Sequence, residues 1–243
     1  TIIMISVKLL AHTPNPDDVV YMSARCCYDP VDMTTEDTSN ISESQKSKLI
    51  KHLYKSGHLS TFEHVSFTFA INGISRICSH QLVRHRIGSS YSQQSQRYIE
   101  MDTNKNMQSV IVPPSIKNKQ SAYDLYKASV DTATCVYHSL LSMGIPKEDA
   151  RYVLPHSWST QLSVTMNARA LHNFFTLRLC KRSQWEIRNL ARMMFIEVNK
   201  VAPLLFAIAG PACLIKGKCE EANPCGRPYT DFEQLKEAFI IEE

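Results

Sequence analysis

The segment Val65-Ser66-Phe67-Thr68-Phe69-Ala70-Ile71 alternates large apolar residues with polar or small ones at every step. Successive side chains of a strand point to opposite faces, so this alternation predicts a half-buried β-strand. The same pattern recurs in Leu162, Val164 and Met166, which predicts a second strand. Strands of this kind suit an antiparallel sheet that packs one face against helices.

Helical patterns surround these two strands. The run Asn15-Pro16-Asp17-Asp18 predicts a helix start capped by Asn15, in a helix that ends near Cys27. Ser42 and Gln45 have the spacing of a capping box, and Gly57 is suited to end the helix that follows. After Gly73 the apolar spacing changes to that of a helix, which we expect to reach about Arg84.

The second half of the chain is also mainly helical. Residues 100–121 are polar and contain proline, which predicts an exposed loop. The clearest helical stripe follows it, from Ala122 to Leu141, and Gly144 ends it. We expect a short helix between Pro146 and Pro155, a helix capped by Asn167, and a last long helix capped by Ser183 with Glu186. These elements predict a single α+β domain over residues 1–243, a mainly antiparallel sheet flanked by helices.

The composition excludes several classes of protein. The chain has 243 residues with 44% hydrophobic and 21% charged residues, which is ordinary for a globular protein. The longest apolar stretch, 201–215, is broken by Pro203, Gly210 and Pro211, so we expect no membrane partner. The 7 glycines are too widely spaced for a dinucleotide fingerprint or a P-loop. The net charge of +4 favours anionic ligands mildly and does not predict a nucleic-acid partner.

The 8 cysteines are too sparse for a small disulfide scaffold. No signal peptide is recognisable, so we expect reduced thiols in a cytoplasmic protein. Cys213, Cys219 and Cys225 could bind zinc with a fourth ligand, but their spacing is unusual for zinc and free thiols are favoured. His58 and His64 are too far apart for a shared helix face, so we predict no metal site.

Polar and basic residues concentrate in the segment 84–98, which contains no acidic residue. Its arginines, serines and glutamines could bind phosphate through guanidinium groups and a polar ring through amides and hydroxyls. A solvated basic turn at a helix end and a nucleic-acid patch are the alternatives. A second concentration comprises Asn167, Arg169, Asn173 and Arg178, of which Arg169 and Asn173 share a helix face.

Five blocks, taken together, resemble the motifs of flavin-dependent thymidylate synthases. The first is Gly57-His58-Leu59-Ser60-Thr61-Phe62-Glu63-His64, which fits G-H-x-[ST]-x-[FY]-E-H, and the second is Arg84-His85-Arg86 followed by Ser95-x-Arg97. The third is Ala150-Arg151-Tyr152-Val153-Leu154-Pro155, the fourth runs from Asn167 to Arg178, and the fifth is Gln184-Trp185-Glu186-Ile187. The blocks occur in the family's order between residues 57 and 187.

The resemblance implies an activity. Enzymes of this family methylate dUMP to dTMP, taking the carbon from methylenetetrahydrofolate and the electrons from NADPH through FAD. It also implies a homotetramer in which flavin and dUMP occupy a cleft shared between subunits. No cysteine lies in the matched substrate run 93–97, so a cysteine nucleophile is not expected, although Cys180 lies two residues after Arg178.

The same resemblance implies roles for individual residues. The residues expected to bind FAD are Ser60, Glu63, Arg84, His85, Arg86, Gln93, Asn167, Arg169 and Asn173. The residues expected to bind dUMP are Gln81, Arg84, Gln93, Gln94, Ser95, Gln96, Arg97, Arg151 and Arg178, and Arg178 is the expected catalytic residue.

The chain departs from the family pattern between Arg86 and Ser95. Eight residues separate them where the family usually has seven, and we expect the extra one in a turn at Gly88-Ser89-Ser90. Gln93 stands where an acid is frequent, so that contact would be neutral. The competing hypotheses are a non-catalytic nucleic-acid-binding protein that uses the basic segment 76–97 and a family member that binds nucleotides without catalysis.

Overall fold

The computed structural model describes residues 5–30, 32–35, 37, 40–101, 107 and 109–237. Its centre is one four-stranded antiparallel sheet with the strand order β1-β2-β4-β3. The strands are β1 (Ser6–His12), β2 (Ser66–Ser75), β3 (Ser89–Gln93) and β4 (Ser159–Asn167). The predicted strands at 65–71 and 162–166 are confirmed as β2 and β4, which pair at the middle of the sheet.

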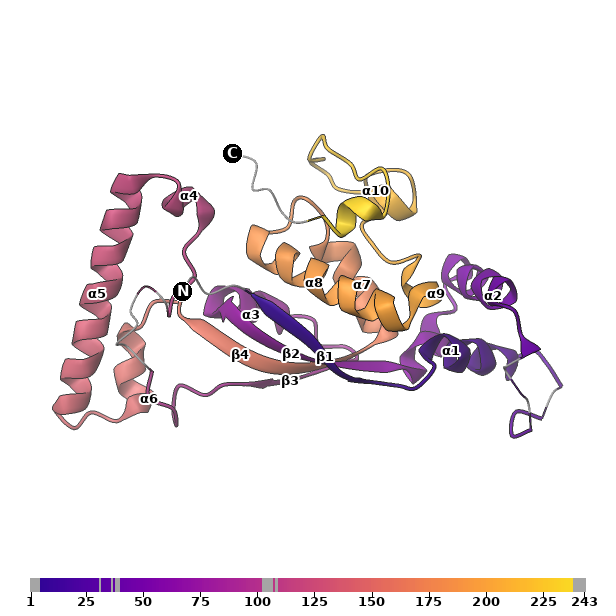
Figure 1. Ribbon diagram of the computed structural model, residues 1–243, viewed down its shortest axis with the longest axis horizontal. Helices are drawn as coiled ribbons and strands as arrows, with labels where there is room; N and C mark the ends of the chain where they lie inside the picture. The colour runs from indigo at the N-terminus through magenta and orange to yellow at the C-terminus, as the bar shows by residue number, and fades with distance from the viewer. Residues whose placement is uncertain are drawn as a thin grey trace.

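The sheet has two different faces. Phe67, Phe69 and Val164 are fully buried. Helices α7 (Ala168–Arg178) and α8 (Trp185–Val201) cover one face of the sheet, as Figure 1 shows. The alternate residues face the other way, where Thr68 and Thr165 share a hydrogen bond of 2.9 Å between their hydroxyls. Figure 1 shows α7 and α8 on the same side of the sheet. The alternation seen in the sequence is therefore the inside–outside pattern of a one-sided sheet.

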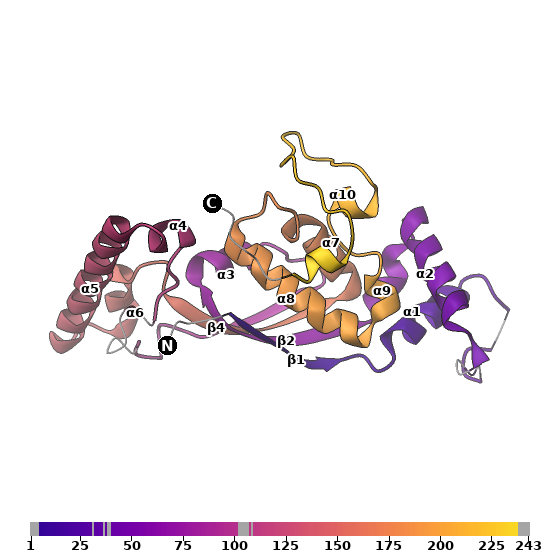
Figure 2. The same cartoon turned by 45° about the horizontal axis from the view of Figure 1, so that its top comes forward.

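Two groups of helices lie beyond opposite ends of the sheet (Figure 2). At one end lie α1 (Pro16–Arg25), α2 (Glu43–Ser56) and α9 (Pro203–Phe206). At the other end α4 (Pro114–Lys117), α5 (Gln120–Ser142) and α6 (Lys147–Ala150) form an arm with its own small core around Tyr137 and Trp158. The shorter elements are α3 (Arg76–Leu82), α10 (Ala212–Ile215), η2 (Leu59–His64), η4 (Arg151–Val153) and η5 (Glu233–Leu235).

The prediction of an exposed loop over residues 100–121 is partly wrong. Its described part includes α4 and a bridge between Val110 and Trp158, and Val110 is buried. Val110 packs into the small core of the arm and so holds this polar segment against it, a contact that the composition of the segment does not predict. Residues 102–106 and 108 lie outside the described residues.

Of the predicted N-terminal caps, Ser183 is wrong, Asn15 is in place without its hydrogen bond, and two are confirmed. Asn15 adopts a left-handed conformation without a capping bond, and Asp17 instead accepts hydrogen bonds from the amides of Leu204 and Leu205. The cap of α8 is Gln184, one residue after the expected Ser183. Glu186 cannot act in a capping box because its carboxylate is bonded to Ser75. The capping box at Ser42 and the Asn167 cap of α7 form as expected.

The helix expected from Ile74 to Arg84 is shorter than predicted. Strand β2 continues to Ser75, whose hydroxyl accepts a hydrogen bond from the amide of Cys78 and so starts α3 at Arg76. The extra residue expected in a turn at Gly88-Ser89-Ser90 is not seen as a longer turn. Gly88 alone has a positive φ, and Ser89 already pairs with Met166 in β3.

No helix of the described residues combines the length and the apolar character that crossing a membrane requires.

Candidate active site

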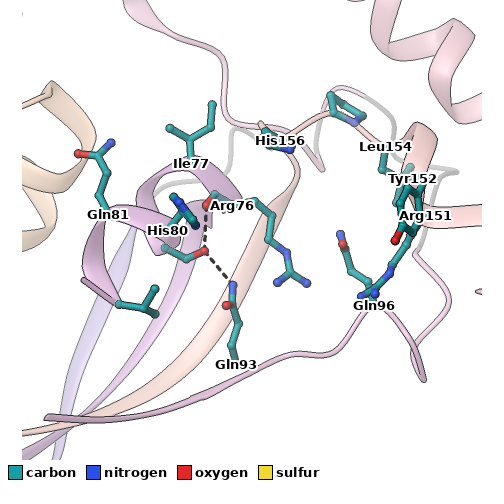
Figure 3. Close-up of a pocket in the computed structure, with 13 residues that line it drawn as sticks. Arg76, Ile77, His80, Gln81, Gln93, Gln96, Arg151, Tyr152, Leu154 and His156 are labelled. Atoms are coloured by element: carbon teal, nitrogen blue, oxygen red, sulfur yellow. Dashed lines mark hydrogen bonds between the residues drawn. The ribbon is translucent and has the colours of Figure 1, made fainter. Parts of the chain in front are cut away.

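A cavity of about 600 Å³ opens between α3 and the segment from Arg151 to His156 (Figure 3). It brings together four of the residues expected to bind dUMP, which are distant in sequence: Gln81, Gln93, Gln96 and Arg151. The lining also includes Arg76, His80 and His156, and it contains no acidic residue. We call this cavity the anion cavity.

The cationic side of the anion cavity consists of two arginines. Burial lowers the pKa of Arg76, and the positive charge of the neighbouring Arg151 lowers it further. Arg76 donates from Nη2 to the carbonyl oxygen of Gln94 at 3.0 Å, while its buried Nε has no hydrogen-bond partner among the described residues. Among the described residues neither arginine is seen in an ion pair, and two such guanidinium groups beside one cavity favour a dianionic ligand such as a phosphate.

Sequence reasoning missed Arg76 as a site residue. It lies eight positions before Arg84, within the basic segment but outside the quoted motif. Only the fold reveals that the first turn of α3 faces Arg151. The one sequence feature that could have indicated Arg76 is its place in the basic segment 76–97, in which the quoted motif begins only at Arg84.

The polar side of the anion cavity is neutral. Gln93 donates from Nε2 to the hydroxyls of Ser79 at 3.0 Å and Thr160 at 3.2 Å, so its amide has a fixed orientation. Gln81 and Gln96 add further amides at the rim. Amides offer both donors and acceptors, which suits a ligand ring with carbonyl and N–H groups.

Three other residues expected to bind dUMP, Gln94, Ser95 and Arg97, are absent from the lining of the anion cavity. Arg97 donates from Nε to the Glu148 carboxylate at 2.8 Å, and the Ser95 hydroxyl accepts from the Arg97 amide at 3.1 Å. The carbonyl of Glu148 accepts from Nε of Arg151 at 2.9 Å, so one residue braces two arginines. Gln94 lines a separate hollow on the open face of the sheet.

A second cavity of about 610 Å³ lies at the start of α7. It brings together Glu63, Asn167, Arg169 and Asn173, four of the residues expected to bind FAD. Arg169 donates from Nη1 to Glu63 at 2.5 Å, and both side chains are about half exposed. Apolar side chains complete the wall, namely Leu59, Ile87 and Tyr54. We call this the helix-start cavity.

The remaining expected FAD residues do not line the helix-start cavity. Ser60 lies on η2 and Arg86 follows α3, and both residues are exposed. Arg84 is exposed too, and its Nη2 lies 3.1 Å from Nε2 of His80. Gln93, which is expected to bind both FAD and dUMP, lines the anion cavity and not the helix-start cavity.

Arg178 and His85 meet at the end of α7. The Nε of Arg178 donates to Nε2 of His85 at 3.0 Å, although 93 residues separate them in the chain. Burial and the charge of Arg178 lower the pKa of His85 to about 4, so the imidazole is neutral near pH 7. Neither residue lines the anion cavity or the helix-start cavity within this single chain.

Known proteins are similar to this chain over most of its length. Residues 8–204 match the family described as thymidylate synthase complementing protein. A flavin-dependent thymidylate synthase of Clostridium tetani is 44% identical over 243 residues, covering 92% of this chain and 94% of the relative. One of Pyrococcus furiosus is 40% identical, covering 90% of this chain and 91% of the relative. The chain belongs to the flavin-dependent thymidylate synthase family.

A solved structure supports the same assignment. The crystal structure of a UMP/dUMP methylase, PolB from Streptomyces cacaoi, bound with 5-Br dUMP, superposes with a TM-score of 0.70 at 27% identity. The match covers 84% of this chain and 93% of that chain. The α+β fold and the family expected from the sequence are therefore confirmed. As a flavin-dependent thymidylate synthase, this chain is an enzyme that uses a flavin and methylates dUMP to dTMP.

The helix-start cavity fits the flavin of such an enzyme. Gly88 at its edge has a φ of +68°, and a Cβ there would lie 2.5 Å from Nδ2 of Asn167. The glycine therefore lets the chain pass directly against the residue that caps α7. The cavity combines amide and guanidinium donors with apolar walls, which suits a ligand that joins a flat ring system to phosphates.

Cysteines are absent from the linings of the three cavities described here. Cys78 is fully buried, and burial together with Glu186 raises the pKa of its thiol. Partial burial also raises the pKa of Cys180. A protonated thiol is a poor nucleophile. Within the described residues no group of three or more Cys, His, Asp or Glu side chains could hold a metal ion.

Proposed function

We propose that the chain forms dTMP by reductive methylation of dUMP, with methylenetetrahydrofolate as carbon donor, NADPH as reductant and no cysteine nucleophile. Bound FAD would supply the redox chemistry that links NADPH to the methylated product. The observation that carries the substrate assignment is the acid-free cavity between Arg76 and Arg151.

The anion cavity is proposed to hold dUMP. The phosphate would lie between Arg76 and Arg151, whose mutual repulsion a dianion relieves. Gln81, Gln93 and Gln96 would then face the nucleoside, with the Gln93 amide held by Ser79 and Thr160. Ser95 and Arg97 would contribute at the rim, where Arg97 can exchange its exposed partner Glu148 for the ligand.

Arg178 is proposed to activate the pyrimidine. The C5 carbon of uracil becomes nucleophilic when electron density is pushed into the ring. In the absence of a thiolate at C6, a guanidinium beside N3 and its adjacent carbonyl can stabilise the negative charge that develops there. Arginine keeps its proton at any working pH, so Arg178 would act as a fixed donor and not as a base.

The helix-start cavity is proposed to hold FAD. Asn167, Arg169 and Asn173 would bind it from α7 and Glu63 from η2, with Ser60, Arg84 and Arg86 reaching it from the rim. Tyr54, Leu59 and Ile87 would exclude water from one side of the bound group.

A homotetramer is proposed because one chain leaves the site incomplete. Arg178 lines neither the anion cavity nor the helix-start cavity. Apart from Gln93, which is expected at both ligands, the expected flavin residues that line a cavity described here are in the helix-start cavity and the expected substrate residues are elsewhere. Association of chains can bring Arg178 of one copy and a flavin cavity of another to a bound dUMP. Light scattering of the holoprotein should give about four chains, and a monomer that retains FAD and activity would contradict this.

The reaction is tested by following conversion of labelled dUMP to dTMP with purified protein, FAD, methylenetetrahydrofolate and NADPH. We expect product only in the complete mixture, and no product when any one component is omitted. The matched control is Arg178→Ala purified in the same way, which excludes a contaminating enzyme. Bound FAD and dUMP without any dTMP would contradict the proposed reaction, as would product formed without FAD.

A nucleic-acid-binding function has less support. Two arginines of the expected sites are already paired with acids, Arg97 with Glu148 and Arg169 with Glu63. A phosphate backbone needs a continuous row of free cations.

A further inference from the structure

We propose that His85 is a positioning residue that holds the guanidinium of Arg178 in the orientation needed to polarise the pyrimidine ring. The contact that supports it is the 3.0 Å hydrogen bond from Nε of Arg178 to Nε2 of His85. This inference rests on the proposed function, because it assigns to His85 an effect exerted through Arg178.

The bond uses the donor of Arg178 that the ligand needs least. A guanidinium has five N–H donors in one plane, and His85 accepts the single one at Nε. The four N–H groups on the two terminal nitrogens form the outward fork that can face a ring nitrogen and its carbonyl. Fixing Nε fixes the plane of the fork, so His85 determines where the fork points.

A neutral imidazole is also the right chemical partner. A carboxylate at this position would bind Arg178 through both kinds of nitrogen and would neutralise much of its charge. The lowered pKa of His85, caused by burial and by Arg178 itself, keeps the ring uncharged near pH 7. Arg178 therefore retains its full positive charge for the negative charge that develops on the substrate.

The imidazole is itself held from several elements. Its ring packs edge-on against Phe174, with centroids 5.0 Å apart at 87°. Phe174 lies one helical turn before Arg178 on α7, so the same helix supports both members of the pair. The backbone of His85 is bonded on both sides, because its amide donates to Leu82 at 3.1 Å and its carbonyl accepts from the Tyr91 hydroxyl at 2.6 Å. An acceptor held so firmly can orient a flexible arginine.

This role differs from the one that the sequence resemblance implies for His85. The resemblance places it on FAD, together with Arg84 and Arg86. In the structure its side chain is absent from the lining of the helix-start cavity and touches Arg178. A positioning role predicts that losing the imidazole changes turnover and leaves flavin content unchanged.

The first test compares turnover, dUMP KM and FAD content in His85→Ala and His85→Gln. We expect His85→Ala to lower kcat about 10- to 100-fold with stoichiometric FAD, as expected for a misplaced catalytic group. Glutamine can accept from Nε of Arg178 through its carbonyl oxygen, so His85→Gln should recover part of the lost kcat. The control is His52→Ala, which removes an exposed histidine from α2 and should change nothing. Loss of FAD in both His85 variants, or wild-type kcat in His85→Ala, would overturn the proposal.

The second test is a double-mutant cycle on dUMP binding to the FAD-loaded protein. Arg178→Ala should weaken dUMP binding about tenfold or more, as expected for a lost charge-assisted bond. If His85 acts only through Arg178, adding His85→Ala to that variant should cause no further loss. A further loss of similar size would show that His85 contacts ligand directly or supports the fold, and would overturn the inference. Unchanged dUMP binding and dTMP formation in Arg178→Ala alone would instead contradict the proposed function.

Discussion

Gly88 and Asn167 are in direct contact at the start of α7. The amide of Asn167 donates to the carbonyl of Gly88 at 2.9 Å, and its side chain fills the space that a Cβ on residue 88 would need. The same side chain caps α7 by accepting from the amide of Ala170 at 2.8 Å. The contact therefore joins the end of the Arg84-His85-Arg86 segment to the helix that carries Arg169, Asn173 and Arg178.

Gly88→Ala should lower both the melting temperature and the FAD content. Alanine would adopt a left-handed conformation and would also push the Asn167 side chain off its cap, which together should destabilise the fold by about 2 kcal/mol or more. Gly144→Ala is the matched control, because Gly144 also has a positive φ but has no heavy atom within 4 Å of its ideal Cβ. It should show only the backbone cost, roughly 1 kcal/mol, with normal FAD content. Equal effects of the two changes would argue against the contact.

Glu186→Ala should destabilise the fold by about 1–3 kcal/mol, because it leaves the buried Ser75 amide without an acceptor. Glu186 is 2% exposed, and its carboxylate accepts from both the amide and the hydroxyl of Ser75 at 2.6 Å. Glu186→Gln keeps one acceptor oxygen and should cost less, which urea unfolding can measure.

The difference in stability between the wild type and Glu186→Gln should depend on pH, because Glu186 ionises and glutamine does not. Burial raises its pKa, so the folded protein holds the proton that the unfolded chain releases. This contribution to stability is present at low pH and is lost as the pH rises from the usual glutamate value through the raised one. Glu186→Gln should not show that loss, and an identical pH profile in both proteins would contradict the assignment.

His172 should make the fold sensitive to mild acid. It is buried between aromatic rings, stacked on Phe206 at 5.5 Å, and burial lowers its pKa from 6.5 to about 4. The unfolded chain therefore binds more protons between these values, so stability is complete above pH 6.5 and falls toward pH 4 by up to about 1.4 kcal/mol per pH unit. The lowered pKa of His85 likewise makes the stability of the fold decrease as the pH falls.

His172→Phe should reduce that slope, measured by urea unfolding from pH 4.5 to 7.5 at fixed protein concentration and saturating FAD. Phenylalanine keeps an aromatic ring beside Phe206 and removes the titrating nitrogen. His138→Gln on the exposed side of α5 is the control and should leave the slope as it is. A wild-type slope in His172→Phe would contradict the prediction.

Cys180→Ser should leave dTMP formation within about tenfold of wild type, a difference of ~1.4 kcal/mol. Cys180 is the thiol nearest in sequence to Arg178, and its raised pKa disfavours the thiolate. Serine replacements of the other seven cysteines should behave alike wherever the fold is retained. Turnover abolished by one replacement, with normal folding and FAD content, would require a covalent mechanism.

The sequence predicts the middle of the fold better than its edges. Alternation identifies β2 and β4 because Phe67, Phe69 and Val164 must all reach the same buried layer. Strand β3, Ser89–Gln93, is composed of serines, a tyrosine and a glutamine and has no such pattern. It is a strand because its backbone pairs with β4 in continuous register, and that partner is distant in sequence.

The candidate site likewise has residues that local patterns predict and residues that only the fold reveals. Motifs locate Arg151, Asn167, Arg169 and Arg178 on local grounds, and the structure places the first three in cavities. The role of Arg76 depends on Arg151 reaching it from the far arm, and the bond between His85 and Arg178 joins two elements across 93 positions. Such pairings follow from tertiary packing, which local spacing does not encode.

The rate of dTMP formation by Arg178→Lys tests most directly whether a fixed guanidinium activates the substrate. Lysine keeps the positive charge but loses the planar fork and the Nε donor that His85 accepts. We predict a rate about 10²–10³ below wild type, close to that of Arg178→Ala, with FAD still bound. Near wild-type dTMP formation by the lysine variant would contradict the account, because charge alone would then suffice.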